Sequence, residues 1–393
     1  MKAVILAAGE GKRLRPFTET MPKVMLPVAN KPILEYVVES LKKAGIHEIV
    51  IVVGYKKEVI MEHFKDYKDV KIEYVTQDKQ IGTAHALLQA KKHIKNDFIV
   101  VSGDNIIDHK SFINLIKDES KYSILIKTRE QSMKYGAVAL EKDTLKGISK
   151  KPDRKSKFIS TGIYKLPSSI FKDIEKMGLE GIYDLTNIIQ ILIDRGVKIK
   201  SVNADLWMEF VYPWDLIHVN EFMTHFTPSS VSGIIEKGVT IKGSVSVGKN
   251  TTIYSGCYII GPVAIGEGCE IGPNACIFPS TTIGNDSVIH PFSQIRNSVI
   301  LDDTHIGSNS FISHSIIGRG CILGNNFSNM VGNAIKKIEE KFEELDNIGT
   351  MIGEHSIIND HVVVEPGVII GRNCHIKSVK RIMENIPSEC KVM

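Results

Sequence analysis

The sequence predicts an α/β domain followed by a left-handed parallel β-helix, and three observations support this prediction. Over residues 1–225, short aliphatic runs alternate with amphipathic helical stretches. Segment 221–233 then loses this periodicity and gains Pro, Ser and Gly, as linkers do. Beyond it, an aliphatic residue recurs at every sixth position. We therefore expect an α/β domain over 1–225, a linker over 226–233, a β-helix domain over 234–382 and a tail over 383–393.

The first part of the chain reads as strands that alternate with helices. Continuous aliphatic runs predict strands, and apolar residues at helical spacing predict helices. The expected strands are Lys2–Ala7, Glu48–Val53, Val70–Val75 and Phe98–Val101, and the expected helices are Ile33–Lys43, Lys56–Lys65 and Thr83–His93. Strands joined through helices form a mixed, mostly parallel sheet, and ligands of such sheets bind beyond the carboxyl ends of the strands.

The second part repeats with a period of six residues. Eleven successive positions hold Ile or Val, namely Ile235, Ile241, Val247, Ile253, Ile259, Ile265, Ile271, Ile277, Ile283, Ile289 and Ile295. The period returns at Ile352, and 14 of the 31 glycines lie within residues 233–330. In a triangular coil each side points one aliphatic side chain inward, and the corners need Gly, Asn or other small residues. This is the hexapeptide pattern of a left-handed β-helix.

The repeat slips between Ile295 and Ile306, and it breaks at residues 329–347. Within the break, Ile335, Ile338, Phe342 and Leu345 stand at helical spacing among Lys and Glu. We therefore predict a helical insertion over 329–347. It is either a solvated amphipathic helix that packs on a neighbour or a substrate loop.

Composition restricts the class of protein. The chain is 43% hydrophobic and 24% charged with a net charge of +4, which fits a globular protein and argues against nucleic acid or membrane partners. The N-terminus lacks the charged and apolar regions of a signal peptide, and no run of 18 apolar residues occurs. All six cysteines follow residue 256 without metal-site spacing. We expect reduced thiols and a cytoplasmic location, the alternative being a disulfide framework.

Phosphate-binding features follow the first expected strand. Residues 6–16 read LAAGEGKRLRP, and Gly9 and Gly11 let the backbone approach a ligand. Arg13 can bind a phosphate with two hydrogen bonds, and Lys23 in Met-Pro-Lys adds a second cation. The string differs from the dinucleotide fingerprint GxGxxG and lacks the GK[ST] ending of a P-loop.

The whole string L-A-A-G-x-G-x-R-L-x-P, followed by P-K, resembles the sugar-1-phosphate nucleotidylyltransferases. Residues 77–86, QDKQIGTAHA, are similar to the base-recognition segment of that family. Together with the hexapeptide repeat, they resemble the bifunctional type that joins N-acetylglucosamine-1-phosphate uridylyltransferase to glucosamine-1-phosphate acetyltransferase, including its archaeal relatives. The resemblance covers nearly the full chain and implies a Rossmann-like nucleotidyltransferase domain.

The resemblance implies a set of site residues. Nucleotide binding would fall to Leu6, Ala8, Gly9, Gly11, Arg13, Lys23, Gln77, Gly82 and Thr83. Within this set, Gln77 would read the uracil edge, and Arg13 and Lys23 would be the catalytic residues on the triphosphate. Mg²⁺ would bind Asp104 and Glu209, the latter in place of an expected Asp. The substrate would be UTP or dTTP. Because a sugar-1-phosphate is already anionic, positioning and charge neutralisation suffice for its attack on the α-phosphorus.

The sugar side of the motif set departs from the family. Gly136, Lys151, Ser160 and Thr161 occupy the sugar-phosphate positions, but Lys150 replaces a carboxylate and Ser160 replaces an Asn. The sugar is therefore left open, with N-acetylglucosamine-1-phosphate as the leading expectation. The alternative is a regulatory pseudoenzyme that binds nucleotide without turnover.

The β-helix domain resembles the acetyltransferase half less closely. His305 and His314 are candidates for a general base that acts on a sugar amine with acetyl-CoA, although the family's His column falls on Ser308. The alternative is that the β-helix serves only oligomerisation. The family implies a homotrimer or a dimer of trimers.

Overall fold

The computed structural model describes residues 1–128, 136–149, 156–338 and 341–393. The chain forms two compact units, and the second includes two short segments from the N-terminal part of the sequence. The first, here called the α/β unit, comprises Met1–Gly11, Met21–Leu26 and Pro32–Glu209. The second, here called the coil unit, comprises Lys12–Thr20, Pro27–Lys31 and Phe210–Met393. The domain limits predicted from the sequence refer to segments that fold independently, and they remain a prediction.

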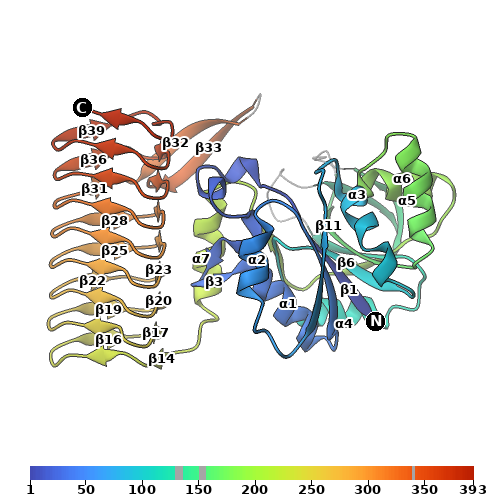
Figure 1. Ribbon diagram of the computed structural model, residues 1–393, viewed down its shortest axis with the longest axis horizontal. Coiled ribbons are helices and arrows are strands. Elements are labelled where there is room, and N and C mark those ends of the chain that lie inside the picture. Colours follow the sequence, from blue (N-terminus) through green and yellow to red (C-terminus); the bar gives the residue numbers. More distant parts are fainter. Residues whose placement is uncertain (129–135, 150–155, 339–340) are drawn as a thin grey trace. The chain divides into compact units, whose positions relative to one another are not determined.

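A nine-stranded sheet forms the centre of the α/β unit, in the order β5-β4-β1-β6-β11-β8-β12-β10-β9 (Figure 1). Its strands are β1 (Lys2–Ala7), β4 (Glu48–Val53), β5 (Lys71–Thr76), β6 (Phe98–Ser102), β8 (Ser123–Thr128), β9 (Ala137–Glu141), β10 (Thr144–Ile148), β11 (Phe158–Leu166) and β12 (Lys200–Asn203). β5, β4, β1 and β6 are parallel, whereas β11 runs antiparallel to β6 and β8. β12 runs parallel to β8, and β10 runs antiparallel to β12 and β9. Among the strands of this sheet, β11 and β10 therefore run opposite to the rest, and the prediction of a mixed, mostly parallel sheet is confirmed.

Helices flank this sheet, and the first three lie within the ranges that the sequence predicts. They are α1 (Ile33–Lys43), α2 (Lys57–His63), α3 (Thr83–Gln89), α4 (His109–Lys117), α5 (Ile170–Leu179) and α6 (Leu185–Asp194), with 3-10 turns η3 (Lys23–Met25) and η4 (Lys91–His93). α1 buries Leu34, Val38 and Leu41 because these residues share one face of the helix. A separate antiparallel pair, β7 (Asn105–Ile107) and β13 (Trp207–Glu209), completes the unit.

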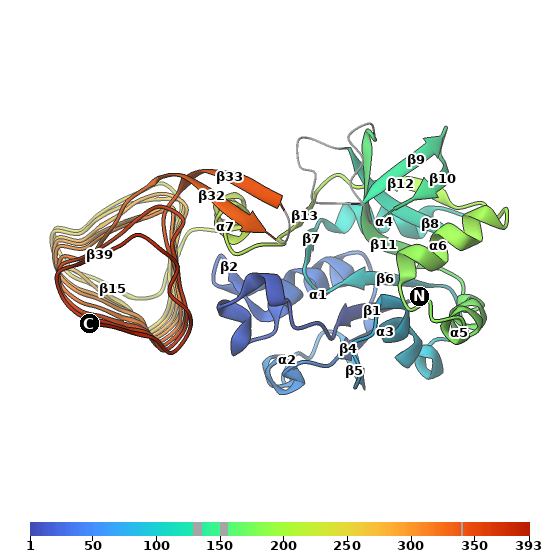
Figure 2. The same ribbon diagram turned by 90° about the horizontal axis from the view of Figure 1, so that it is seen from above.

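Three parallel sheets wind into the β-helix of the coil unit, and Figure 2 shows their triangular cross-section. The first sheet contains β14 (Ser230–Val231), β17 (Val245–Val247), β20 (Val263–Ile265), β23 (Thr281–Ile283), β26 (Val299–Ile300), β29 (Ile316–Ile317), β34 (Met351–Ile352) and β37 (Ile369–Ile370). The second contains β15 (Ile234–Ile235), β18 (Thr252–Ile253), β21 (Glu270–Ile271), β24 (Val288–Ile289), β27 (His305–Ile306), β30 (Ile322–Leu323), β35 (Ile357–Ile358), β38 (His375–Ile376) and β40 (Lys391–Val392).

The third sheet contains β16 (Thr240–Lys242), β19 (Tyr258–Ile260), β22 (Cys276–Ile277), β25 (Gln294–Arg296), β28 (Phe311–Ser313), β31 (Ser328–Asn329), β36 (Val362–Val364) and β39 (Lys380–Ile382). The coil unit also holds α7 (Asp215–Thr224), η1 (Lys12–Leu14), η2 (Phe17–Glu19) and β2 (Pro27–Val28), which pairs with β3 (Lys31–Pro32). No helix in the described ranges is both long and apolar enough to cross a bilayer.

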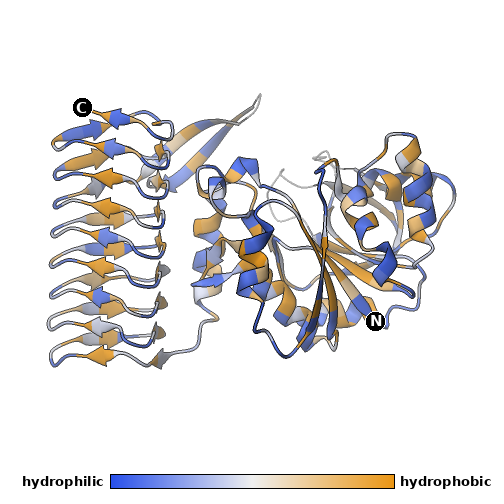
Figure 3. Cartoon of the chain, viewed as in Figure 1, coloured by the Kyte–Doolittle hydropathy of each residue, from blue (hydrophilic) through white to orange (hydrophobic). Residues whose placement is uncertain are grey.

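The hexapeptide positions form the core of the coil, which confirms the repeat. Val247 and every sixth residue from there to Ile295 lie in one buried cluster, and Ile235 and Ile241 pack against its end. Figure 3 shows the hydrophobic residues that recur along the strands. The predicted slip has a simple cause. Ile265 pairs with Ile283, but Ile283 pairs with Ile300, so that turn of the coil is one residue shorter. All six cysteines are free thiols, as expected.

The predicted helical insertion over 329–347 is wrong. β32 (Gly332–Ile338) and β33 (Lys341–Ile348) form an antiparallel hairpin that projects from the coil (Figure 1). The register places Lys336 opposite Glu343, an opposite-charge pair of the kind that stabilises paired strands. Lys336 also bonds through Nζ to Asn385 Oδ1 of the coil at 3.0 Å. These pairings outweigh a helical periodicity that extends over only a few residues.

Candidate active site

The glycine-rich loop begins where β1 ends, at the carboxyl edge of the parallel strands. Ala8 O accepts hydrogen bonds from Tyr55 N at 3.1 Å and from Gln80 Nε2 at 2.7 Å, so this backbone is fixed from two other segments. Gly11 has a φ of +74°, and a Cβ there would lie 2.7 Å from Lys23 Cβ. A side chain at Gly11 is therefore excluded both by conformation and by the passage of Lys23. Gly9 has open space in the direction of a Cβ.

The predicted base-recognition residues also meet in the structure. Gln77 is 4% exposed, and its Nε2 donates to Gly82 O at 3.1 Å. The same nitrogen lies 3.0 Å from His85 Nδ1. A Cβ on Gly82 would lie 2.2 Å from Tyr183 O, so only glycine allows this approach. Gln77 and Gly82 are thus brought together.

His85 and Gln80 of this segment have no role in the sequence-based prediction, and Thr83 has a structural role. His85 holds the Gln77 amide, and Gln80 fixes Ala8, which binds the two loops to each other. Both lie inside the quoted motif, so the signal was present in the sequence. Thr83 Oγ1 accepts from Leu185 N at 2.9 Å and lies 3.3 Å from Asp184 Oδ2. Its hydroxyl therefore helps to start α6.

Lys23, Asp104 and Glu209 form a buried charged cluster within the α/β unit. Lys23 Nζ makes an ion pair with Asp104 Oδ2, and it lies 3.6 Å from Glu209 Oε1. The two carboxylates meet because β7 pairs with β13, with Asn105 opposite Glu209, and Asp104 directly precedes Asn105. Lys23 comes from η3, which directly follows Pro22. The tertiary pairing thus unites three segments distant in sequence.

The charges of this cluster shift one another's ionisation. Burial lowers the pKa of Lys23, but Asp104 and Glu209 outweigh that effect and the pKa is raised. Burial raises the pKa of Asp104, but the Lys23 ammonium outweighs it and the pKa is lowered. Burial and the Asp104 charge raise the pKa of Glu209 to about 7. One ammonium therefore does not fully compensate two buried carboxylates.

This excess of negative charge fits a divalent cation. Carboxylate oxygens are the ligands that Mg²⁺ prefers, and Mg²⁺ sites commonly use one or two carboxylates together with substrate phosphates. Asp104 and Glu209 supply such a pair. In the part of the chain that the structure describes, no group of three or more His, Cys, Asp or Glu side chains could hold a metal. A site here would therefore draw its remaining ligands from substrate and water.

The predicted sugar-side residues are partly gathered. Gly136 O accepts from Ser160 N at 3.0 Å, so these two positions are adjacent. Thr161 is buried, and its hydroxyl donates to Leu125 O at 2.6 Å, which stabilises the irregular register of β11 against β8. Lys150 and Lys151 lie outside the described residues.

Arg13 lies in η1, within the coil unit rather than the α/β unit that contains Lys23. The two histidines are not brought together. His305 is in β27 of the second sheet, whereas His314 lies in the turn between β28 and β29 with its Nδ1 2.8 Å from Ser313 Oγ. Burial lowers the pKa of His314, and although the Glu221 carboxylate opposes this effect, Arg296 and His218 add to it and the pKa is lowered.

Comparisons with known proteins agree with this arrangement. Residues 2–225 match the nucleotidyl transferase family model, and residues 259–335 match the GMPPB C-terminal domain model. A bifunctional protein GlmU of Methanococcus maripaludis is 35% identical over 96% of this chain and 95% of its own. A bifunctional sugar-1-phosphate nucleotidylyltransferase/acetyltransferase of Sulfurisphaera tokodaii is 34% identical over 96% of each.

A solved structure shares the fold of the first part. A Bacillus anthracis protein described as a glucose-1-phosphate thymidylyltransferase superposes with a TM-score of 0.52 at 26% identity, over 56% of this chain and 94% of its own. The nucleotidyl transferase match over residues 2–225 includes the loop after β1, Asp104 and Glu209. The chain is therefore a sugar-1-phosphate nucleotidyltransferase of the nucleotidyl transferase family, and it belongs to the archaeal GlmU-like type within that family.

Proposed function

We propose that the protein transfers a uridylyl group from UTP to N-acetylglucosamine-1-phosphate in a Mg²⁺-dependent reaction. The observation that supports this most directly is the buried cluster of Lys23, Asp104 and Glu209 beside the strand that follows the base-recognition segment. The name of the Sulfurisphaera relative, a sugar-1-phosphate nucleotidylyltransferase/acetyltransferase, supports nucleotidyl transfer to a sugar-1-phosphate.

The chain's own residues have separate tasks in this reaction. Gln77 and Gly82 hold the base, and the loop from Ala8 to Gly11 approaches the phosphates with its backbone. Arg13 and Lys23 bind the triphosphate and offset the charge that develops as pyrophosphate leaves. Mg²⁺ held by Asp104 and Glu209 would supply further charge neutralisation. Because the attacking phosphate oxygen is already anionic, no residue has to remove a proton.

A direct assay tests the proposal. Protein, UTP and Mg²⁺ are incubated with a panel of sugar-1-phosphates, and pyrophosphate release is measured, with dTTP in parallel. We expect the highest kcat/KM with UTP and N-acetylglucosamine-1-phosphate, and loss of release with a chelator. UTP binding without release for any sugar would instead support the regulatory pseudoenzyme, to which Ser160 and Glu209 point as departures from the family pattern.

We propose acetyl transfer to glucosamine-1-phosphate as a second activity of the β-helix. The name of the Sulfurisphaera relative supports it, and so does the lowered pKa of His314, which keeps the imidazole in its basic form at neutral pH. An acetyl-CoA assay on His314→Ala and His305→Ala separately identifies the base. If neither substitution lowers the rate, neither histidine has that role.

We further propose that the β-helix is left-handed and assembles the protein as a trimer or a dimer of trimers. The hexapeptide period from Ile235 to Ile295 supports the handedness, and the flat sides of the coil suit association. A monomeric mass by light scattering at micromolar concentration would refute the assembly.

A further inference from the structure

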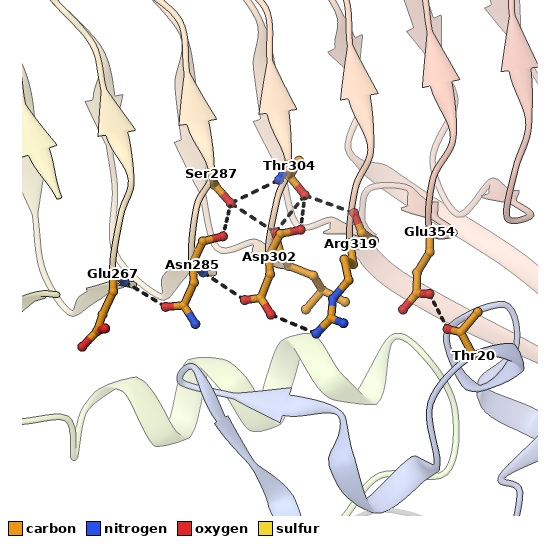
Figure 4. A network of polar contacts seen from close by, with 10 residues as sticks. Thr20, Glu267, Asn285, Ser287, Asp302, Thr304, Arg319 and Glu354 are labelled. Carbon is orange, nitrogen blue, oxygen red and sulfur yellow. Dashed lines mark hydrogen bonds and ion pairs between the residues drawn. The ribbon is translucent and has the colours of Figure 1, made fainter. Parts of the chain in front are cut away.

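One corner of the coil carries a long or polar side chain in successive turns, and we call this set the corner row. Strand registers place its members above one another, each two residues beyond an inward aliphatic position. Its members are Glu267, Asn285, Asp302, Arg319, Glu354, Arg372 and Ser388. Figure 4 shows the row from Glu267 to Glu354.

The first four members bond to one another. Asn285 Oδ1 accepts from Glu267 N at 2.8 Å, and Asp302 Oδ1 accepts from Asn285 N at 2.9 Å. Arg319 Nη2 completes the series with an ion pair to Asp302 Oδ2 at 3.0 Å (Figure 4). This part of the row therefore connects turns of the coil to one another.

The last three members also contact the segment that directly follows the glycine-rich loop. Thr20 Oγ1 donates to Glu354 Oε2, as Figure 4 shows. Arg372 Nε makes an ion pair with Glu19 Oε2 at 2.8 Å, and Ser388 Oγ donates to the same oxygen at 3.2 Å. Glu354 is only 3% exposed, so its carboxylate depends on such partners for its solvation.

A second segment of the N-terminal region is fixed to the coil independently. Asn30 Nδ2 donates to Ile283 O at 2.7 Å and to Ala264 O at 3.3 Å, with Asn30 in the left-handed conformation at φ 60°. Asn220 Oδ1 accepts from Ala29 N at 2.9 Å. Segments 12–20 and 27–31 are thus both part of the coil unit, and residues 21–26, which include Lys23, connect them.

We propose that Glu354, Arg372 and Ser388 are positioning residues for nucleotidyl transfer. They fix the conformation of residues 12–20, which begin immediately after Gly11 and carry Arg13. The inference rests on the proposed function, since that function assigns Arg13 to the triphosphate. The β-helix then acts in the nucleotide reaction through residues 12–20, which it holds in place, whether or not it has an activity of its own.

The test uses a matched pair of variants of the full-length protein, Arg372→Ala and Arg319→Ala. Both remove an arginine from the corner row, and of the two only Arg372 contacts residues 12–20. Loss of the anchor displaces Arg13, and small displacements of a binding group have large kinetic effects. We expect Arg372→Ala to raise the KM for UTP about tenfold. Arg319→Ala leaves it unchanged, and Arg372→Lys, which keeps the charge opposite Glu19, restores most of the loss.

Hydrogen exchange over residues 12–20 supplies a readout that does not depend on activity. We expect faster exchange there in Arg372→Ala and wild-type exchange in Arg319→Ala. Equal effects of the two variants on KM would overturn the inference, and so would faster exchange without a change in KM. If the wild type releases no pyrophosphate with any sugar-1-phosphate, the proposed function fails. The dissociation constant for UTP then replaces KM, and equal constants for the two variants overturn the positioning role.

Discussion

The two compact units reach order in opposite ways. In the coil unit each turn repeats the one before it, so an inward Ile such as Ile277 contacts equivalent residues above and below. In the α/β unit the charged cluster exists only because three distant segments, around Lys23, Asp104 and Glu209, converge. Because the coil repeats, the effects of substitutions in distant turns on its stability should add. Because the cluster depends on convergence, it should be sensitive to the loss of any one of its members.

The sharpest test of this contrast is Asp104→Asn. It removes a charge that both balances Lys23 and would bind a metal, so we expect kcat to fall about 10³-fold. Steady-state pyrophosphate release measures the effect. Asp302→Asn, the same substitution in the corner row, is the control and should retain wild-type kcat. A comparable loss in both variants would show that the cluster has no special role.

The coil core is tested by Ile277→Ala. The side chain is fully buried, so its truncation should lower the free energy of unfolding by about 3 kcal/mol. Denaturant unfolding measures this, and kcat in the folded protein should stay the same. Ile322→Ala is the control, since Ile322 is 48% exposed on the outer face and should cost less than about 0.5 kcal/mol. Equal costs would contradict the inward assignment of the repeat.

A pH-dependent contribution is expected from Asp118, at the end of α4. Burial raises the pKa of this carboxyl, but hydrogen bonds from Ser123 and Ser120 and the Lys200 ammonium outweigh it and lower the pKa to about 2. The folded pKa lies below the unfolded one. The stabilisation is therefore present above pH ~4 and is lost as pH falls towards ~2.

Asp118→Asn should thus lower the free energy of unfolding by up to about 2 kcal/mol at pH 7, and by much less near pH 3. Thermal unfolding of both proteins at the two pH values measures the difference. Glu141→Gln removes an exposed carboxylate that pairs with Lys146, and it should have no measurable effect at either pH. A loss for Asp118→Asn that does not depend on pH would contradict the electrostatic explanation.

The smallest effect is expected at the projecting hairpin. Phe342 is 72% exposed on β33, so Phe342→Ser should change the free energy of unfolding by less than about 0.5 kcal/mol. Differential scanning calorimetry at dilute and concentrated protein checks this. A large loss of stability that occurs only at the high protein concentration would show instead that the hairpin is covered by another copy of the chain.

Much of the fold could be predicted because its signals are local. The strand Lys2–Ala7 and the helix Ile33–Lys43 have the bounds that their periodicity indicates. The hexapeptide repeat specified the coil core down to individual residues such as Ile277. The segment 332–348 forms a hairpin instead of the predicted helix because cross-strand pairs such as Lys336 and Glu343 outweigh a helical spacing of only a few apolar residues.

The sequence by itself determined the inward aliphatic positions of the coil and the residue types of the nucleotide loop, because both are written in short, regular spacing. Only the tertiary structure decided that Lys23 lies between Asp104 and Glu209, since this depends on the pairing of β7 with β13. It also decided that residues 12–20 pack with the coil through Glu19 and Thr20. Contacts between residues hundreds of positions apart leave no periodic trace in the chain, because each is made once.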